Sequence, residues 1–264
     1  MRFLTVASAV LALVLAAPAA AQLTVVAEYR MGEDDVGAVI GGPGAAQTQP
    51  GAAGSPLQQF GAPVYGAGGT PRGRTSTLSM RFDGSSARYG GPALAMPTDN
   101  FGVEAWARSN STTGNAMIVY NGNSATSGFG LFRSGANWAF LYGGIVIGGS
   151  TPVTPGWTHL AIVRDAGVNR FFVNGIQVST SGEAPNPPAG ALNIGGNNLL
   201  ATEFFDGEID EVRLFTFAPG AFSPSLLNTA ERPAMPVPSL TLTGSALLAL
   251  VLALLGVFAL RSRS

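Results

Sequence analysis

The chain lacks cysteine altogether and has only one histidine, His159, among its 264 residues. These absences exclude disulfides, thiolate metal ligands and a cysteine nucleophile, as well as zinc sites built from several His or Cys side chains. Lysine is also missing, because all fourteen basic residues are arginine. A domain with this composition must be held together by the packing of its core alone.

Clustered positive charge is missing as well. Without Arg2, Arg261 and Arg263, eleven arginines stand against fifteen acidic residues, which gives a net charge near −4 for the rest of the chain. Nucleic acids, heparin-like chains and anionic lipid surfaces call for clustered basic residues, whereas these arginines are scattered. We therefore expect no nucleic-acid partner.

The first long apolar run lies at the amino end. Arg2 precedes apolar residues 3–17, and Pro18 with three alanines follows at the positions that a signal peptidase reads. Residues 1–21 are therefore interpreted as a helical signal peptide, and the mature chain is expected to begin at Gln22. A transmembrane helix is the less favoured alternative here, because the apolar core is short for a bilayer.

The second apolar run lies at the carboxyl end, where residues 240–260 include only three polar side chains. This length crosses a hydrocarbon core of about 30 Å, so we predict a transmembrane helix over 240–260. Arg261 and Arg263 then form a cytoplasmic basic tail, residues 261–264, because positive residues stay on the cytoplasmic side. The preceding domain is expected on the outer side of that membrane, joined to it by the Pro-rich linker 233–239.

Residues 22–232 show turn residues in place of helical periodicity. The whole chain has 36 glycines and 18 prolines, and short apolar segments alternate with Gly, Asn and Ser turns. We predict one all-β domain of two antiparallel sheets, with a first strand at 25–31. Residues 37–77 are predicted to be a long flexible surface loop, because their Gly, Ala, Pro, Gln and Ser cannot bury enough apolar area.

The stretch from residue 157 to residue 215 is the most informative. Residues 157–164 form an apolar run typical of a strand covered on both faces. The dipeptide Asn174-Gly175 accepts the positive φ angles of a type I′ turn, so it predicts a hairpin between two antiparallel strands. Asp206-Gly207 predicts a further turn before an acidic strand at 208–214.

These segments resemble, in order, the laminin-G-like domains of the concanavalin A-like jelly-roll fold that many secreted bacterial proteins contain. The resemblance rests on Trp157, His159, Val163-Arg164-Asp165, Phe172-Val173-Asn174-Gly175, and Gly207 with Ile209-Asp210-Glu211-Val212-Arg213, and upstream on Met80–Gly84 and Phe101–Arg108. It implies a two-sheet jelly-roll sandwich that binds a glycan or a surface protein. It also implies that the first strand, at 25–31, pairs with a late strand at 208–214, as terminal strands do in jelly rolls. A passive structural component of a surface or matrix is the alternative.

The carboxyl end resembles the proteobacterial sorting signals of the IPTL and PEP types. Here Val237-Pro238-Ser239-Leu240 stands where the first type has Ile-Pro-Thr-Leu, and an apolar helix and terminal arginines follow. The resemblance implies recognition of the tail by a membrane protease, whereas the alternative is a plain membrane anchor. The chain is thus expected at the cell surface or in the periplasm, either anchored or released.

Catalytic chemistry is weakly supported. His159 shares a strand face with apolar residues, which favours a hydrogen-bonded core histidine, and no G-x-S-x-G elbow accompanies it. Glu208 and Asp210 match the first two carboxylates of the jelly-roll glycoside hydrolases. Val212 and Arg213 replace the last glutamate of that motif, so hydrolysis is disfavoured. We expect Asp210 and Glu211 to pair with arginines such as Arg164 and Arg213 and with turn amides.

Two sets of residues are candidates for binding. Calcium prefers carboxylate, amide and carbonyl oxygens, and the residues that could supply them in or beside loops are Asp83, Asp99, Asn100, Asn121 and Asn123. Aromatic rings can stack on sugars, and the candidates for that role are Tyr89, Tyr120, Trp138 and Tyr142. Trp106 and Trp157 lie in apolar strands and are expected in the core.

Overall fold

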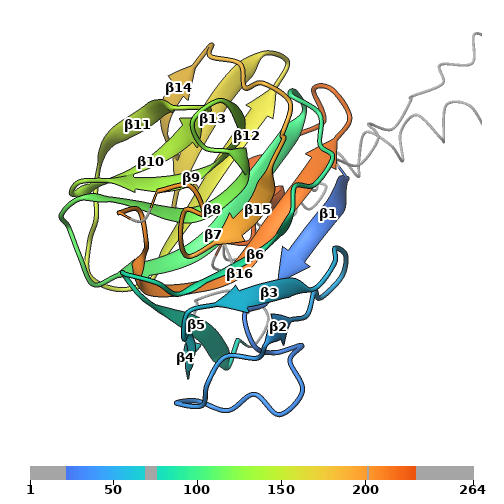
Figure 1. The fold of residues 1–264 in the computed structure, drawn as a ribbon. Helices are drawn as coiled ribbons and strands as arrows, with labels where there is room; N and C mark the ends of the chain where they lie inside the picture. Colours follow the sequence, from blue (N-terminus) through green and yellow to red (C-terminus); the bar gives the residue numbers. More distant parts are fainter. Residues whose placement is uncertain (1–21, 69–75, 201, 230–264) are drawn as a thin grey trace, which may run out of the picture.

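The computed structural model describes residues 22–68, 76–200 and 202–229. The predicted signal peptide, the linker, the transmembrane helix and the basic tail lie outside these ranges. Within them, no helix is both long and apolar enough to span a membrane. The described residues form two antiparallel β-sheets stacked face to face (Figure 1). The prediction of an all-β jelly-roll sandwich is confirmed.

The first layer, sheet A, has the strand order β14-β13-β12-β7-β16-β5-β4, and β1 also pairs with β16. Its strands are β1 (Leu23–Tyr29), β4 (Val64–Ala67), β5 (Leu78–Asp83), β7 (Phe101–Ser109), β12 (Thr158–Asp165), β13 (Val168–Val173), β14 (Ile176–Ser181) and β16 (Asp206–Phe217).

The second layer, sheet B, has the strand order β11-β10-β9-β8-β15-β6-β3-β2. Its strands are β2 (Gln47–Thr48), β3 (Leu57–Phe60), β6 (Arg88–Pro92), β8 (Asn115–Asn123), β9 (Ser127–Ser134), β10 (Asn137–Tyr142), β11 (Ile145–Pro152) and β15 (Ala191–Ile194).

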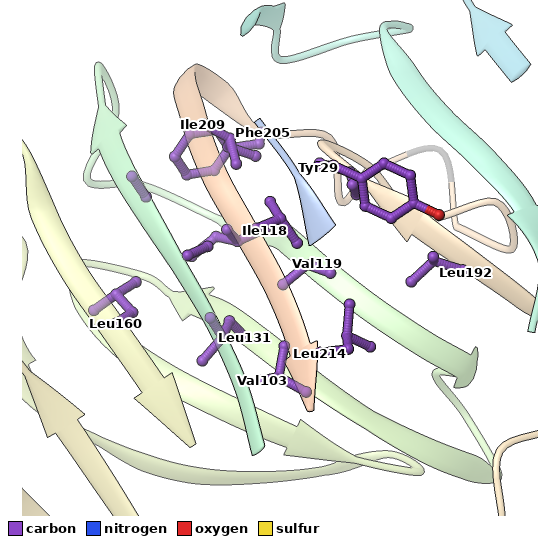
Figure 2. Packing of buried hydrophobic residues seen from close by; sticks show 14 of the residues in the cluster. Tyr29, Val103, Ile118, Val119, Leu131, Leu160, Leu192, Phe205, Ile209 and Leu214 are labelled. Atoms are coloured by element: carbon purple, nitrogen blue, oxygen red, sulfur yellow. The ribbon is translucent and has the colours of Figure 1, made fainter. Parts of the chain in front are cut away.

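The core lies between the layers and follows from the two-residue period of the strands. On β7, Val103 and Ala105 point inward and are fully buried. Figure 2 shows side chains from both sheets in this core, among them Leu160 and Leu214 of sheet A and Leu131 of sheet B. This burial is the main source of stability in a chain that has no disulfide.

The last strand, β16, organises sheet A. One of its edges pairs with β7, whereas the other pairs first with β5 and then with β1. The register shifts between Asp210 and Arg213, and Glu211 adopts a positive φ of 53° at that bulge. β1 pairs along Leu23↔Phe217 to Tyr29↔Val212, which confirms the predicted pairing of the first and last strands.

The hairpin turn has the predicted residues and conformation. Asn174 has φ 51° and Gly175 has φ 76°, between the paired residues Val173 and Ile176. Two consecutive positive φ angles are what a type I′ turn requires, and Asn and Gly accept them most readily. The prediction from this dipeptide is confirmed.

The prediction of a continuous loop over residues 37–77 is wrong. Three short strands, β2, β3 and β4, lie within it and extend the edges of both sheets. Leu57 and Tyr65 are buried, and the Tyr65 hydroxyl donates a hydrogen bond of 2.8 Å to Oδ2 of Asp35. A few buried side chains and edge pairing thus order a segment that its composition alone assigns to a loop.

A carboxyl-terminal strap, residues 218–229, crosses the outer face of sheet A. It contains a short 3₁₀ turn, Pro224–Leu226. Leu227 joins an apolar cluster with Val163 and Phe172, which point to the outer face of sheet A. The strap therefore covers part of that face.

Candidate ligand-binding surface

The four aromatic residues expected to stack on sugars are not at the surface. Tyr89, Tyr120, Trp138 and Tyr142 are each at most 2% exposed. The Tyr120 hydroxyl donates to the carbonyl of Ser127, and burial raises the pKa of Tyr120 to about 12. Tyr89, Trp138 and Tyr142 pack in the core between the sheets, and Tyr120 packs in a separate buried cluster. The prediction that these residues bind ligand is therefore corrected.

The five residues proposed for calcium do not form one site. Asp83 ends β5, beside the start of β16. Asp99 and Asn100 directly precede β7, beside the end of β16. Asp83 and the pair Asp99 and Asn100 are therefore separated by the length of β7, a strand of 9 residues that rises roughly 3.3 Å per residue. Among the described residues, no group of three or more His, Cys, Asp or Glu side chains is arranged to hold a metal ion.

The other two members of the calcium set serve the structure. Asn121 is fully buried in β8, where it accepts a hydrogen bond from the Leu94 amide and donates one to the Leu94 carbonyl. Oδ1 of Asn123 accepts from the Ala125 amide in the following turn. Asn121 is therefore committed to the backbone of a segment distant in sequence, and Asn123 to its own turn, as Asn often is.

The carboxylate of Asp83 is held by its own loop. It accepts hydrogen bonds of 2.8–2.9 Å from the backbone amides of Ser85, Ser86 and Ala87, and a fourth from the Ser86 hydroxyl. Partial burial by itself would raise the pKa of Asp83, but these donors hold that pKa well below its ordinary value. Asp83 is therefore ionised throughout the physiological range.

The acidic strand agrees in part with the expectation, because Glu211 contacts an arginine, Arg30. Asp210 is buried and accepts a hydrogen bond of 2.6 Å from the Ser76 hydroxyl, and Glu211 lies 3.7 Å from Nε of Arg30. Arg164 instead lies beside Asp99, and Arg213 beside Glu104. The bulge after Asp210 shifts the register of the strand, so strict alternation does not give its contacts.

The end of sheet A near the start of β16 carries a row of polar and aromatic side chains. In register across the sheet, Arg108 of β7 faces Glu208 of β16, and Glu208 faces Arg81 of β5. Arg108 and Glu208 form an ion pair, and the Arg108 guanidinium lies 5.3 Å from the ring centre of Trp157. We call Trp157, Arg108, Glu208 and Arg81 the polar row.

A hollow of about 350 Å³ continues the polar row toward the edge strand β4. Its walls are formed by Ala62, Val64, Arg81, Phe82, Asp83 and Asp206. Asp83 and Asp206 are paired directly across β5 and β16, and Oδ1 of Asp206 accepts a hydrogen bond from Asn110. Arg81 is exposed beside these two carboxylates. The surface thus combines an aromatic ring, arginine donors and carboxylate acceptors.

Sequence reasoning assigned Trp157 to the core, but the structure leaves it half-buried. β12 begins one residue later, at Thr158, so the ring lies at the end of the sheet and outside its covered interior. Gly156, with φ 97°, marks the turn that places it there. The turn residue Gly156 directly before Trp157 could have indicated that Trp157 lies at the start of the strand and not within it.

A buried charged cluster lies under the strap beside the polar row. Glu104 of β7 contacts His159 of β12 and Arg213 of β16, and it accepts a hydrogen bond of 2.9 Å from the Asn228 amide. Burial alone would raise the pKa of Glu104, but Arg213, His159 and Asn228 together hold it below its ordinary value. The prediction that His159 is a hydrogen-bonded core residue agrees with this position.

Comparison of the sequence with protein families gives one match. The family described as the concanavalin A-like lectin/glucanases superfamily, of the laminin-G type, matches residues 83–221. The chain belongs to this family, which confirms the resemblance. The family joins lectins and glucanases, so it suggests carbohydrate as the ligand class without separating binding from hydrolysis. No curated protein sequence matches the chain.

The comparison with solved structures gives matches at low sequence identity. Domain 4 of AbnA, a GH43 extracellular arabinanase from Geobacillus stearothermophilus, in complex with arabinotriose, is 16% identical with a TM-score of 0.57; the match covers 77% of this chain and 96% of that one. Trypanosoma rangeli sialidase in complex with sialic acid is 11% identical, with a TM-score of 0.49 and coverage of 75% and 31%. The botulinum neurotoxin type G receptor binding domain is 13% identical, with a TM-score of 0.42 and coverage of 64% and 47%.

Proposed function

We propose that this protein is an exported glycan-binding module that uses the polar row and the adjoining hollow on sheet A as its binding surface. The observation that carries the proposal is the half-buried Trp157 beside Arg108, in register with Glu208 and Arg81. The proposal includes presentation on the outer side of a bacterial membrane, through the sorting or anchor segment that the carboxyl end resembles.

The chemistry of the surface suits a sugar. An aromatic face packs against the C–H face of a sugar ring, and arginine and carboxylate groups bind pairs of hydroxyls. A volume of about 350 Å³ lies in the range of small-molecule sites. Arg108, Glu208 and Arg81 lie on paired strands of one sheet, which fixes the spacing of their backbones before the ligand arrives.

Hydrolysis is the weaker alternative. Displacement at a glycosidic bond needs two carboxyl groups across a cleft, one of them free to act as acid. Of the two motif carboxylates, Glu208 is paired with Arg108, and Asp210 is buried in contact with Ser76. The arrangement supports binding without turnover.

The test is glycan binding by the full-length chain purified in detergent. A glycan array with and without added calcium identifies the ligand and the role of the metal, and arabinotriose is included as a probe because domain 4 of AbnA was solved with it. We expect Trp157→Ala and Arg81→Ala each to weaken binding of the identified glycan by about tenfold or more, as measured by titration calorimetry.

Arg170→Ala is the matched control. Arg170 lies on β13 of the same sheet, lies 3.5 Å from Asp165 and is outside the polar row, so its loss should leave affinity unchanged. Equal affinity of the Trp157→Ala and wild-type chains would refute the assignment of the site. The absence of any glycan ligand would favour a passive structural role.

A further inference from the structure

We propose that the outer face of sheet B carries a second ligand site, which takes a small organic cation with an apolar body. A hollow of about 320 Å³ lies there, on the layer opposite the polar row. It is lined by Asn115, Ser124, Ala125, Phe132, Leu141, Gly144, Val146, Leu200 and Glu203. The inference rests on this hollow alone and does not depend on glycan binding at sheet A.

The floor of the hollow is apolar. Phe132 of β9 and Leu141 of β10 belong to a buried cluster with Met117 and Tyr120 on the outer face of sheet B. This cluster is separate from the core between the sheets. A layer of buried apolar side chains beneath an open hollow provides a dry surface for an apolar ligand group.

The walls expose apolar side chains on two sides. Val146 of β11 is 43% exposed, and Leu200, in the loop between β15 and β16, is 49% exposed. Both line the hollow from different elements. A ligand with an apolar body would cover both side chains, and their removal from water would favour its binding.

The polar side of the hollow is a fixed carboxylate. The buried Asn197 donates from Nδ2 to Oε2 of Glu203 at 2.6 Å and lies 2.9 Å from the Ser124 hydroxyl. The carbonyl of Glu203 accepts hydrogen bonds from the amides of Met117 and Asn197, which fix the loop to β8. The acceptor is therefore in place before any ligand binds.

The charge of the hollow selects the ligand. Glu203 is the one titratable residue among the described residues that line it. Arg133, which follows Phe132 on β9, donates instead to the carbonyls of Thr113, Gly114 and Gly135. A carboxylate beside an apolar floor, with no cation on its walls, favours a protonated amine on an apolar body over a neutral or anionic ligand.

The experiment compares two probes of one shape that differ in charge. The isotopically labelled full-length chain in detergent is titrated with cyclohexylmethylammonium and with neutral cyclohexylmethanol, and amide chemical shifts are followed by NMR. We expect the ammonium probe to shift the amides of Leu199, Leu200 and Glu203 in a saturable way and to bind about tenfold tighter than the alcohol. Equal affinity for the two probes, or no saturable shift at these amides, would overturn the proposal.

Variants separate the carboxylate from the apolar wall. Glu203→Gln keeps an oxygen to accept from Asn197 and should reduce the affinity for the ammonium probe about tenfold, whereas Leu200→Ala should weaken both probes. Asp34→Asn, a charge-matched change in the loop after β1, should have no effect. Trp157→Ala should leave the ammonium affinity intact, so that failure at the sheet A site is distinguishable from failure here. An unchanged ammonium affinity in Glu203→Gln contradicts the inference.

Discussion

Nε2 of His159 lies 2.9 Å from Oε2 of Glu104, and both side chains are completely buried between sheet A and the strap. The same carboxylate contacts Arg213 and accepts from the Asn228 amide. Nε1 of Trp106, on the next outward position of β7, donates to the Asn228 carbonyl at 2.9 Å. Three strands and the strap are thus joined through one ionised group.

Replacement of Glu104 by Gln is therefore expected to destabilise the domain. Arg213 would keep its buried position without a countercharge, and loss of one partner of a buried pair costs about 3 kcal/mol or more in the free energy of unfolding. Urea unfolding followed by tryptophan fluorescence measures this. Glu183→Gln, at an exposed position, is the control and should stay within about 0.5 kcal/mol of the wild type. Equal stability of the two variants would contradict the assigned role.

The lowered pKa of Glu104 also predicts a direction for the dependence of stability on pH. Because the folded-state pKa lies below the unfolded value of about 4.3, the stabilisation is fully present above that pH. It is lost as the pH falls below about 4.3 and through the folded-state pKa. The free energy of unfolding of the wild type, measured between pH 6 and pH 3, should fall more steeply than that of Glu104→Gln. Parallel curves would show that other carboxylates dominate.

Gly175→Ala tests the hairpin turn. Its φ of 76° is strained for a residue with a side chain, and a Cβ there would lie 3.0 Å from Cγ2 of Thr229. We expect a loss of about 1–2 kcal/mol in the free energy of unfolding. Gly182→Ala is the matched control, because open space surrounds that position. A thermal melt that places both variants at the same midpoint would rule out the strain.

Gly102→Ala tests the close approach of β7 to an aromatic ring. A Cβ at residue 102 would lie 2.2 Å from Cζ of Phe215, on the outer face of sheet A under the strap. Overpacking of this kind costs about 1–3 kcal/mol. Adding Phe215→Leu to Gly102→Ala should restore part of the loss in a double-mutant cycle, and simple additivity of the two changes would argue against the contact.

The sequence was sufficient for the strands whose signals are local. Asn174-Gly175 predicted its own turn, and the apolar run after Trp157 predicted a covered strand, because backbone preference and burial agree there. The pairing of the first and last strands followed from the family resemblance, and the structure confirms it.

The candidate site was harder to predict, because it depends on register and on which face is open. Strict alternation of side chains cannot reveal the bulge at Glu211. Composition cannot show that Tyr120 is buried in a cluster, whereas Trp157 is half-buried just before a strand begins. Arg108, Glu208 and Arg81 are far apart along the chain and meet only through strand pairing. Such a row is visible only once the sheet order is known.

The pairing of Leu23 with Phe217 has a consequence for the order in which the domain can assemble. During synthesis, the earliest segment must wait for its neighbour until nearly the entire domain has emerged, because local contacts cannot substitute for this distant one. Shortened forms that stop before Asp206 would leave β1, β5 and β7 each with a bare edge able to recruit other chains. Fragments for laboratory work should therefore retain β16 in full.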